Sequence, residues 1–211
     1  MTVETHQPAD RGVVTASGRI GIMGGTFDPI HYGHLIMAES VMHSVNADGM
    51  LFVPARAHPF KAQEQLADYD HRARMVRLAI ENNARFRLET PPPGCRYTVD
   101  LIDYLKNNYP ATEFFLPVGS DIIEEFHAWY RHDDIERNIR IVIAARPGYR
   151  PKSVRRDVLK SAEQVVIPQY DVSSTEIRKR VASQMSIKYL VPDPVLEYIA
   201  QTGLYIGENA Q

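Results

Sequence analysis

The sequence has very little cysteine and no long hydrophobic run. Cys95 is the only cysteine among 211 residues, so no disulfide can form within the chain. Such sparing use of cysteine is typical of proteins in a reducing compartment, and we expect a cytoplasmic location. No apolar stretch approaches the roughly 18 residues that a membrane-spanning helix needs, so we expect no membrane partner.

A strong charge of either sign is also missing. The formal net charge is −2, which argues against an extended nucleic-acid-binding surface but leaves room for a local basic site that holds one nucleotide. Hydrophobic residues make up 44% and charged residues 24% of the chain, values that are ordinary for a globular protein with a substantial core.

The chain also lacks internal repeats and low-complexity segments, so its division into parts rests on local patterns. Residues 1–18 are polar and contain no apolar core of the kind that signal peptides have, which predicts a flexible leader. Residues 19–206 are long enough for one domain, and we expect their C-terminal part, about 171–206, to be a small helical piece. The sequence leaves open whether copies of the chain form a homo-oligomer.

The most informative stretch is residues 20–34, which read IGIMGGTFDPIHYGH. A short apolar run ends in Gly24 and Gly25, a turn follows, and an apolar-periodic segment covers residues 35–45, so we expect a strand, a loop and a helix. Paired glycines allow close approach to the backbone, and the free amides at the start of a helix attract an anion. This connection between the strand and the helix therefore predicts a phosphate-binding site.

Two histidines, His31 and His34, stand three residues apart where this helix begins. At that spacing both imidazoles can lie on one side of a bound anion. The alternative is that one histidine caps or packs while the other is solvated. The stretch has neither the Gly-x-x-x-x-Gly-Lys-Ser/Thr spacing of a P-loop nor Gly-x-Gly-x-x-Gly, so it is a phosphate loop of another kind.

Further along the chain, apolar runs alternate with helical patterns. Together with the first strand they give about six mostly β-branched strands, which predicts a doubly wound, mostly parallel α/β sheet of Rossmann-like architecture. The further predicted strands are 50–54, 85–89, 113–118, 139–145 and 164–168. The predicted helices between and after them are 68–83, 99–108, 154–161, one that begins after Ser173, and one that ends near Gly203.

Polar candidates follow several of these strands, at the edge where open parallel sheets bind ligands. They are Arg56, His58 and Lys61 after the second strand, Gly119 and Asp121 after the fourth, and Arg146 after the fifth. A solvated basic loop and a helix-capping aspartate are the alternatives. Later, Ser173 and Glu176 predict a capping box, and Arg178 lies close enough to reach an anion held at that helix start.

Residues 24–34 resemble the Gly-Gly-Thr-Phe-Asp-Pro-x-His-x-Gly-His signature of the bacterial nicotinate mononucleotide adenylyltransferases. Their wider nucleotidyltransferase superfamily shares His-x-Gly-His, and its second signature, Ser-Ser-Thr-x-x-Arg, is matched by residues 173–178. The resemblance covers roughly residues 19–206. The loop 58–61 departs from it, because His-Pro-Phe-Lys stands where the family usually has Pro-Pro-His-Lys, and Ala55 replaces a common asparagine.

The resemblance implies adenylyl transfer from ATP to nicotinate mononucleotide, a step of NAD biosynthesis that yields deamido-NAD and pyrophosphate. It implies catalytic roles for His31, His34 and Arg178. It implies ATP contacts from Gly24, Gly25, Thr26, Phe27, His31, His34, Gly119, Asp121, Arg146, Ser173, Ser174, Thr175 and Arg178. It implies mononucleotide contacts from Lys61, Tyr97, Thr98 and Trp129. From the pattern alone, Thr98 would be a helix N-cap and Trp129, the only tryptophan, a core residue.

The chemistry suits these residues, since the attacking phosphate oxygen is already ionised and needs no covalent nucleophile. No carboxylate cluster predicts a metal cage, so we expect Mg²⁺ to arrive bound mainly through the ATP phosphates. The alternatives are another adenylyl- or cytidylyltransferase, an enzyme that accepts both nicotinate and nicotinamide mononucleotide, and a non-catalytic nucleotide sensor. A sensor would have lost His31, His34 or Arg178, and all three are present.

Overall fold

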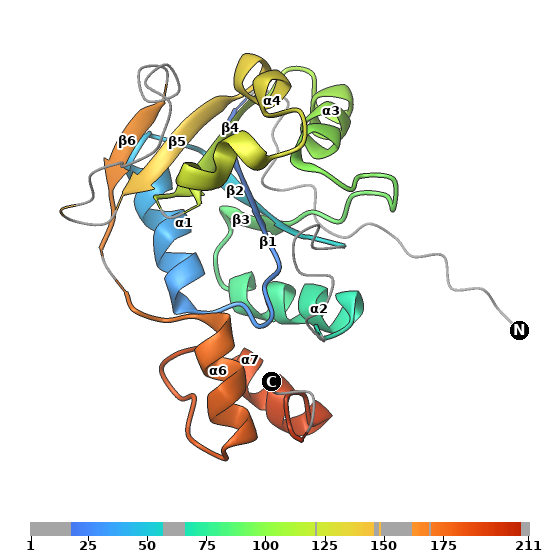
Figure 1. The fold of residues 1–211 in the computed structure, drawn as a ribbon, viewed down its shortest axis with the longest axis vertical. Helices are drawn as coiled ribbons and strands as arrows, with labels where there is room; N and C mark the ends of the chain where they lie inside the picture. The colour runs from blue at the N-terminus through green and yellow to red at the C-terminus, as the bar shows by residue number, and fades with distance from the viewer. Residues whose placement is uncertain are drawn as a thin grey trace, which may run out of the picture.

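The centre of the structure is a six-stranded sheet in which every pairing is parallel and the strand order is β3-β2-β1-β4-β5-β6 (Figure 1). This computed structural model describes residues 18–56, 66–120, 122–145, 148, 162–168 and 170–207. The strands are β1 (Arg19–Gly25), β2 (Gly49–Pro54), β3 (Phe86–Leu88), β4 (Glu113–Gly119), β5 (Arg140–Ala145) and β6 (Glu163–Val166). The predicted doubly wound parallel sheet is confirmed.

Helices cover both faces of this sheet. They are α1 (Tyr32–Ser44), α2 (Tyr69–Ile80), α3 (Thr98–Asn108), the 3₁₀ helix η1 (Ile123–Ala128), α4 (His132–Asn138), α6 (Ser174–Ala182) and α7 (Asp193–Thr202). The predicted helix 154–161 and most of the predicted leader lie outside the described residues. None of the helices in the described ranges is long and apolar enough to cross a membrane.

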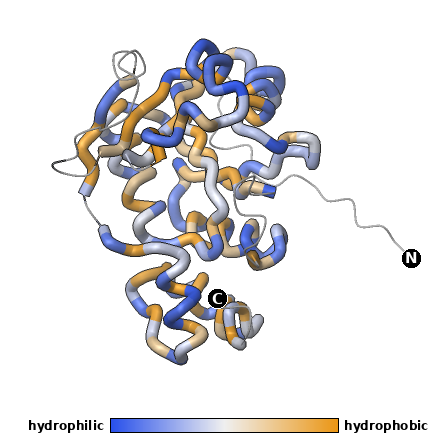
Figure 2. Tube along the Cα trace, in the orientation of Figure 1, coloured by the Kyte–Doolittle hydropathy of each residue, from blue (hydrophilic) through white to orange (hydrophobic). Residues whose placement is uncertain are grey.

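Alternation along the strands builds two apolar layers, because successive side chains of a strand point to opposite faces. In β2, Met50 and Phe52 join the layer formed with α1, α2, α6 and α7, whereas Leu51 and Val53 join the layer formed with α3, η1 and α4. Figure 2 shows the result, with hydrophobic residues along much of the sheet and hydrophilic ones prominent on the outer helix α4. A strand buried on both faces has a continuous apolar sequence, which is why these strands are predictable.

Two predicted helix starts differ in detail. Tyr97, in extended backbone geometry, is the N-cap of α3, and Thr98 is its first helical residue, so the expected Thr98 cap is wrong. The reason is Asp100, whose carboxylate accepts hydrogen bonds from the backbone N–H groups of Arg96 (3.1 Å) and Tyr97 (3.0 Å). At α6 half of the predicted capping box is present, because the Ser173 hydroxyl accepts from the Glu176 N–H at 3.2 Å. The Glu176 carboxylate pairs with Arg180 instead (3.0 Å).

Helix α2 ends at Ile80, three residues earlier than the sequence predicts. The side chain of Asn83 contributes to the turn that follows, since its oxygen accepts from the Arg85 N–H (3.0 Å) and its amide donates to Glu39 (3.2 Å). At the C-terminal end α7 packs against α2, where the Tyr198 hydroxyl and His71 Nδ1 are 2.8 Å apart. Helices α6 and α7, orange and red in Figure 1, lie together at one end of the molecule, near α2.

Candidate active site

The candidate site lies where the sheet changes direction. After β1 the chain moves outward to β2 and β3, then returns so that β4 pairs on the other side of β1. In open parallel sheets, the crevice at the carboxyl ends of two such strands is where ligands bind. Gly24 and Gly25 close β1 and Gly119 closes β4, so three predicted site residues lie at this point.

Residues 26–31, which we call the histidine loop, connect β1 to α1. Its Phe27 has a left-handed backbone (φ 53°), unusual for a side chain of this size and worth about 1 kcal/mol of strain. The ring is 2% exposed and folds back over Gly25, where an added Cβ would lie 2.9 Å from the Phe27 Cζ atom. Gly25 is therefore required by the packing of Phe27.

His31, the last residue of the loop, and His34, on the first turn of α1, stack on each other. The ring centroids of His31 and His34 are 3.8 Å apart with planes inclined by 25°, and Phe27 contacts His34 edge-on at 5.0 Å. His31 occupies the N-cap position of α1, and it is 6% exposed. The structure thus brings together three of the residues that the first signature singles out.

Both imidazoles are neutral in this environment. Burial lowers the pKa of His31 to about 4. Burial, and then the nearby His31, hold the pKa of His34 well below its usual value. His34 Nδ1 accepts a hydrogen bond from the His31 backbone N–H (3.3 Å), which leaves the single ring proton on Nε2. His34 therefore presents an N–H donor without carrying a positive charge.

Gly33, between the two histidines, makes room for this stack. A Cβ at this position would lie 3.0 Å from Cε1 and Nδ1 of the His31 ring. The buried Nδ1 atom of His31 has no hydrogen-bond partner within the part of the chain that the structure describes. An unsatisfied buried nitrogen is costly, and at a candidate site it is available to a ligand.

The second signature packs directly onto the histidine loop. The Ser174 hydroxyl donates to the Pro29 carbonyl oxygen (2.8 Å), and Arg178 Nη1 donates to the Asp28 carbonyl oxygen (2.9 Å). Arg178 is 7% exposed, and its Nη1 lies 3.8 Å from Asp28 Oδ2. Ser173 caps α6, and Thr175 is exposed on its first turn. Two motifs about 140 residues apart in sequence thus form one substructure.

One contributor to this substructure was not identified from the sequence. Arg72 on α2 is 3% exposed and donates from Nη1 to the Thr26 carbonyl oxygen (2.7 Å) and from Nε to the Ala67 carbonyl oxygen (2.9 Å). Burial lowers the pKa of Arg72 from the usual arginine value. No motif marks this arginine, since it resembles any other in a charged amphipathic helix.

Three of the four predicted mononucleotide residues, Tyr97, Thr98 and Trp129, belong to elements on the other face of the sheet. Trp129 ends η1 half-buried, with its ring 5.4 Å from that of Phe126. The exposed rings of Tyr97 and Tyr130 lie 4.4 Å apart, so the start of α3 touches the segment next to Trp129. Tyr130 was missed, although its place beside the only tryptophan was a usable signal.

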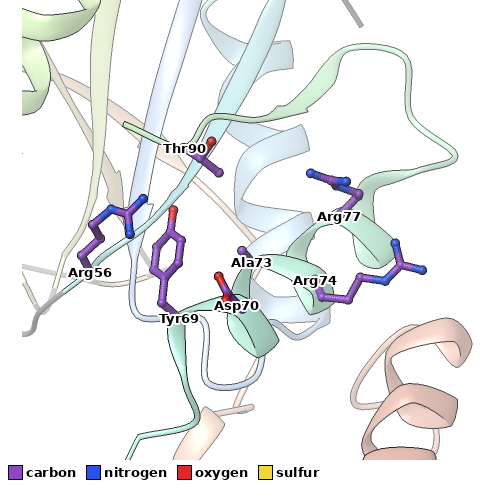
Figure 3. Close-up of a pocket in the computed structure, with 7 residues that line it drawn as sticks. All are labelled: Arg56, Tyr69, Asp70, Ala73, Arg74, Arg77 and Thr90. Carbon is purple, nitrogen blue, oxygen red and sulfur yellow. The ribbon is translucent and has the colours of Figure 1, made fainter. Parts of the chain in front are cut away.

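A basic cavity of about 360 Å³ adjoins the ends of β2 and β3 (Figure 3). It is lined by Arg56, Tyr69, Asp70, Ala73, Arg74, Arg77 and Thr90. The Arg56 guanidinium stacks 4.2 Å from the centre of the Tyr69 ring, and within the described ranges neither Arg74 nor Arg77 forms an ion pair. Three guanidinium groups against one carboxylate make this hollow attractive to anions.

Three predicted site residues cannot be placed, because Lys61, Asp121 and Arg146 lie outside the described residues. His58 of the basic loop lies outside them as well. Among the residues that are described, no three His, Cys, Asp or Glu side chains come together as in a metal cage.

Comparison with known proteins agrees with this geometry. The cytidylyltransferase-like family model matches residues 22–180, which includes both signatures. A Bacillus subtilis protein named nicotinate-nucleotide adenylyltransferase is 37% identical over 190 residues, covering 89% of this chain and 98% of its own. A Bacillus pumilus protein named "Probable nicotinate-nucleotide adenylyltransferase" is 40% identical with the same coverage.

The chain belongs to the nicotinate-nucleotide adenylyltransferase family. This confirms the resemblance carried by the two signatures. A solved structure of Plasmodium falciparum nicotinic acid mononucleotide adenylyltransferase complexed with NaAD has the same fold, with a TM-score of 0.72 at 23% identity. The same enzyme complexed with APC gives a TM-score of 0.71, and both matches cover 89% of this chain and 97% of the other. Nicotinate-nucleotide adenylyltransferases of distant organisms thus share this sheet.

Proposed function

We propose that this protein transfers the adenylyl group of ATP to nicotinate mononucleotide, giving deamido-NAD and pyrophosphate in NAD biosynthesis. The observation that carries the proposal is the direct contact between the two signatures, in which Ser174 and Arg178 hold the loop that ends at His31 and leads to His34. The family relationship supports the same activity.

The reaction needs one displacement. An ionised phosphate oxygen of the mononucleotide attacks the α-phosphorus of ATP, the bond to the α,β-bridging oxygen breaks, and the electron pair leaves with pyrophosphate. No covalent intermediate is required, so the work of the protein is alignment and charge stabilisation. The proton on Nε2 makes His34 a donor for a phosphate oxygen whose charge grows in the transition state.

We assign ATP to the junction of the histidine loop, the start of α6 and the end of β4. Gly24 is exposed there, and an added Cβ would meet no atom within 4 Å, so a phosphate can approach the backbone. We assign the pyridine ring to the half-buried face of Trp129, close to Tyr97 and Thr98 at the start of α3. The basic cavity beside β2 adds positive potential that attracts both anionic substrates.

We further propose that Mg²⁺ enters with the ATP phosphates, because no metal cage forms among the described residues. When bound it would neutralise charge on the departing pyrophosphate. The buried Asp28 is not a good ligand for it, since one carboxylate oxygen already accepts from Tyr205. The single cysteine of the chain supports a cytoplasmic location for the reaction.

The test is pyrophosphate release from ATP with a panel of acceptors. The panel contains nicotinate mononucleotide, nicotinamide mononucleotide, phosphopantetheine and a sugar phosphate, with CTP replacing ATP in a parallel series. We expect the fastest release with ATP and nicotinate mononucleotide. A higher kcat/KM for any other acceptor, or for CTP, would overturn the proposal and identify another member of the superfamily.

A further inference from the structure

The histidine loop has no regular secondary structure, yet its backbone is held at three points by other elements. The carbonyl oxygens of Thr26, Asp28 and Pro29 accept hydrogen bonds from Arg72, Arg178 and Ser174, at 2.7, 2.9 and 2.8 Å. Helix α2 supplies the first donor and α6 the other two. The shape of the loop is therefore set by two helices that lie about 40 to 150 residues further along the sequence.

A fourth attachment uses the side chain of Asp28, which is 1% exposed. Its Oδ1 atom accepts from the Tyr205 hydroxyl at 2.7 Å and from the Ala67 N–H at 3.3 Å. Tyr205 is 4% exposed and follows α7, just beyond the C-cap Gly203. The turn that follows α7 thus reaches the loop of the first signature.

The hydroxyl of Tyr205 keeps its proton near neutral pH and acts as a donor to Asp28. Burial, and then the Asp28 carboxylate, raise the pKa of Tyr205 above the usual tyrosine value. Among the described residues, its other hydrogen-bond partner is the Met75 sulfur at 4.0 Å, a weak acceptor. The hydrogen bond to Asp28 therefore satisfies the buried Tyr205 hydroxyl. Because it goes to a carboxylate, it is of the strong, charge-assisted kind.

Resting on the proposed function, we propose that Tyr205 is a positioning residue for catalysis, acting through Asp28 on the backbone that leads to His31 and His34. Asp28 precedes His31 by three residues, and the intervening Pro29 and Ile30 are buried. A reaction that depends on alignment loses rate when donors move by about 1 Å. The C-terminal turn is thus part of the apparatus that aims the two imidazoles.

The competing explanation is that Tyr205 only fastens the C-terminal helices to the rest of the protein. Tyr198 provides a matched control, because its hydroxyl pairs with His71 Nδ1 at 2.8 Å in the same contact between α2 and α7. No hydrogen bond joins Tyr198 to the histidine loop within the described residues. Removing either hydroxyl weakens C-terminal packing, but only one of them reaches Asp28.

The experiment compares Tyr205→Phe with Tyr198→Phe in the full-length protein. We expect Tyr205→Phe to lower kcat about tenfold while the KM values for both substrates stay within about twofold. Tyr198→Phe should also lower Tm, and it should leave kcat within about twofold of wild type. The ring ¹⁵N chemical shifts of His31 and His34 should move in Tyr205→Phe only. Equal kcat values for the two variants would overturn the proposal.

A double-mutant cycle tests the route through Asp28. If Tyr205 acts through this carboxylate, adding Tyr205→Phe to Asp28→Ala, which removes the acceptor, costs little further kcat, whereas independent, additive losses would contradict the route. Should Asp28→Ala fail to fold, the comparison of the two tyrosine variants decides alone. His34→Asn in the same assay separates the two proposals. Full activity in His34→Asn refutes the proposed role of the histidines. If His34→Asn loses activity while Tyr205→Phe has normal kcat, only the positioning role of Tyr205 is refuted.

Discussion

His31 and His34 form a stacked pair in which the backbone N–H of the first donates to Nδ1 of the second, at 3.3 Å. This one contact fixes the tautomer of His34 and leaves its N–H donor on Nε2. Gly33 is the residue that permits the stack, because any side chain there would press on the His31 ring. The His-x-Gly-His spacing therefore encodes a donor of defined orientation.

Removing that donor should slow chemistry rather than weaken binding. His34→Asn retains an acceptor near the position of Nδ1 but has nothing at Nε2, so kcat should fall about 10²-fold or more with a smaller change in KM. His34→Gln can place an amide N–H near the lost position and should recover part of the rate. His43→Asn, at the exposed last turn of the same helix, is the control and should keep full activity. An effect on KM alone would show that His34 only binds ATP.

The low pKa of His31 also predicts how stability depends on pH. Above pH 6.5 this histidine is neutral in both states, but between pH 6.5 and about 4 the unfolded chain binds a proton that the folded protein refuses. The free energy of unfolding should therefore decrease as pH falls through this window, by roughly 3 kcal/mol from His31.

Carboxylates titrate in the same window, so the measurement is a difference between two proteins. Urea unfolding of wild type and His31→Asn at several pH values from 7.5 to 4.5 should give curves of stability against pH that converge toward acid, because the variant lacks the titrating ring. Parallel curves would mean that His31 does not have the depressed pKa that its burial implies.

Much of this site was predictable because its chemistry is local in sequence. The paired glycines, both histidines and the capped start of α6 each depend on neighbours within a few residues, and continuous apolar runs mark β2, β4 and β5 as buried strands. Thr98 was misassigned because a threonine before an apolar-periodic segment is an ordinary N-cap signal. Asp100, reaching back to the Arg96 and Tyr97 amides, displaced it.

What the sequence did not reveal depends on long-range contact. Arg72 and Tyr205 meet the histidine loop across sequence separations of 46 and 177 residues. Nothing in their local patterns distinguishes them from a surface arginine or a tyrosine that ends a helix. Their importance comes from burial against carbonyl and carboxylate oxygens, which only the packing of α2 and α7 beside the loop creates.

The two glycines that end β1 should respond differently to alanine. At Gly24 an added Cβ meets nothing within 4 Å, so Gly24→Ala should leave Tm unchanged and raise the KM for ATP about tenfold where a phosphate approaches the backbone. At Gly25 the Cβ would lie 2.9 Å from Phe27, so Gly25→Ala should displace the ring that supports His34 and cost about 1–3 kcal/mol of stability along with kcat. Thermal unfolding and steady-state kinetics of both variants check this. An unchanged KM in Gly24→Ala would remove that glycine from the ATP site.

The last prediction concerns the pyridine substituent. The proposed pocket holds the ring against Trp129, whose flat surface distinguishes a carboxylate from a carboxamide only weakly. Selection must come from polar groups near the substituent, and the start of α3 provides the Thr98 hydroxyl and the amides of its first turn. Donors and partial positive charge at a helix N-terminus favour a carboxylate, whereas a carboxamide would direct its own N–H groups at them.

We therefore expect kcat/KM for nicotinate mononucleotide to exceed that for the nicotinamide form by at least ~10². Thr98→Val keeps the shape of the side chain and removes its donor, so this ratio should shrink about tenfold, chiefly through the nicotinate substrate. Thr202→Val, which removes a hydroxyl bonded to the Tyr198 carbonyl oxygen at the far end of α7, should leave the ratio unchanged. Near-equal values for the two substrates in wild type would exclude the helix start as the selective element, because its donors cannot treat a carboxylate and a carboxamide alike.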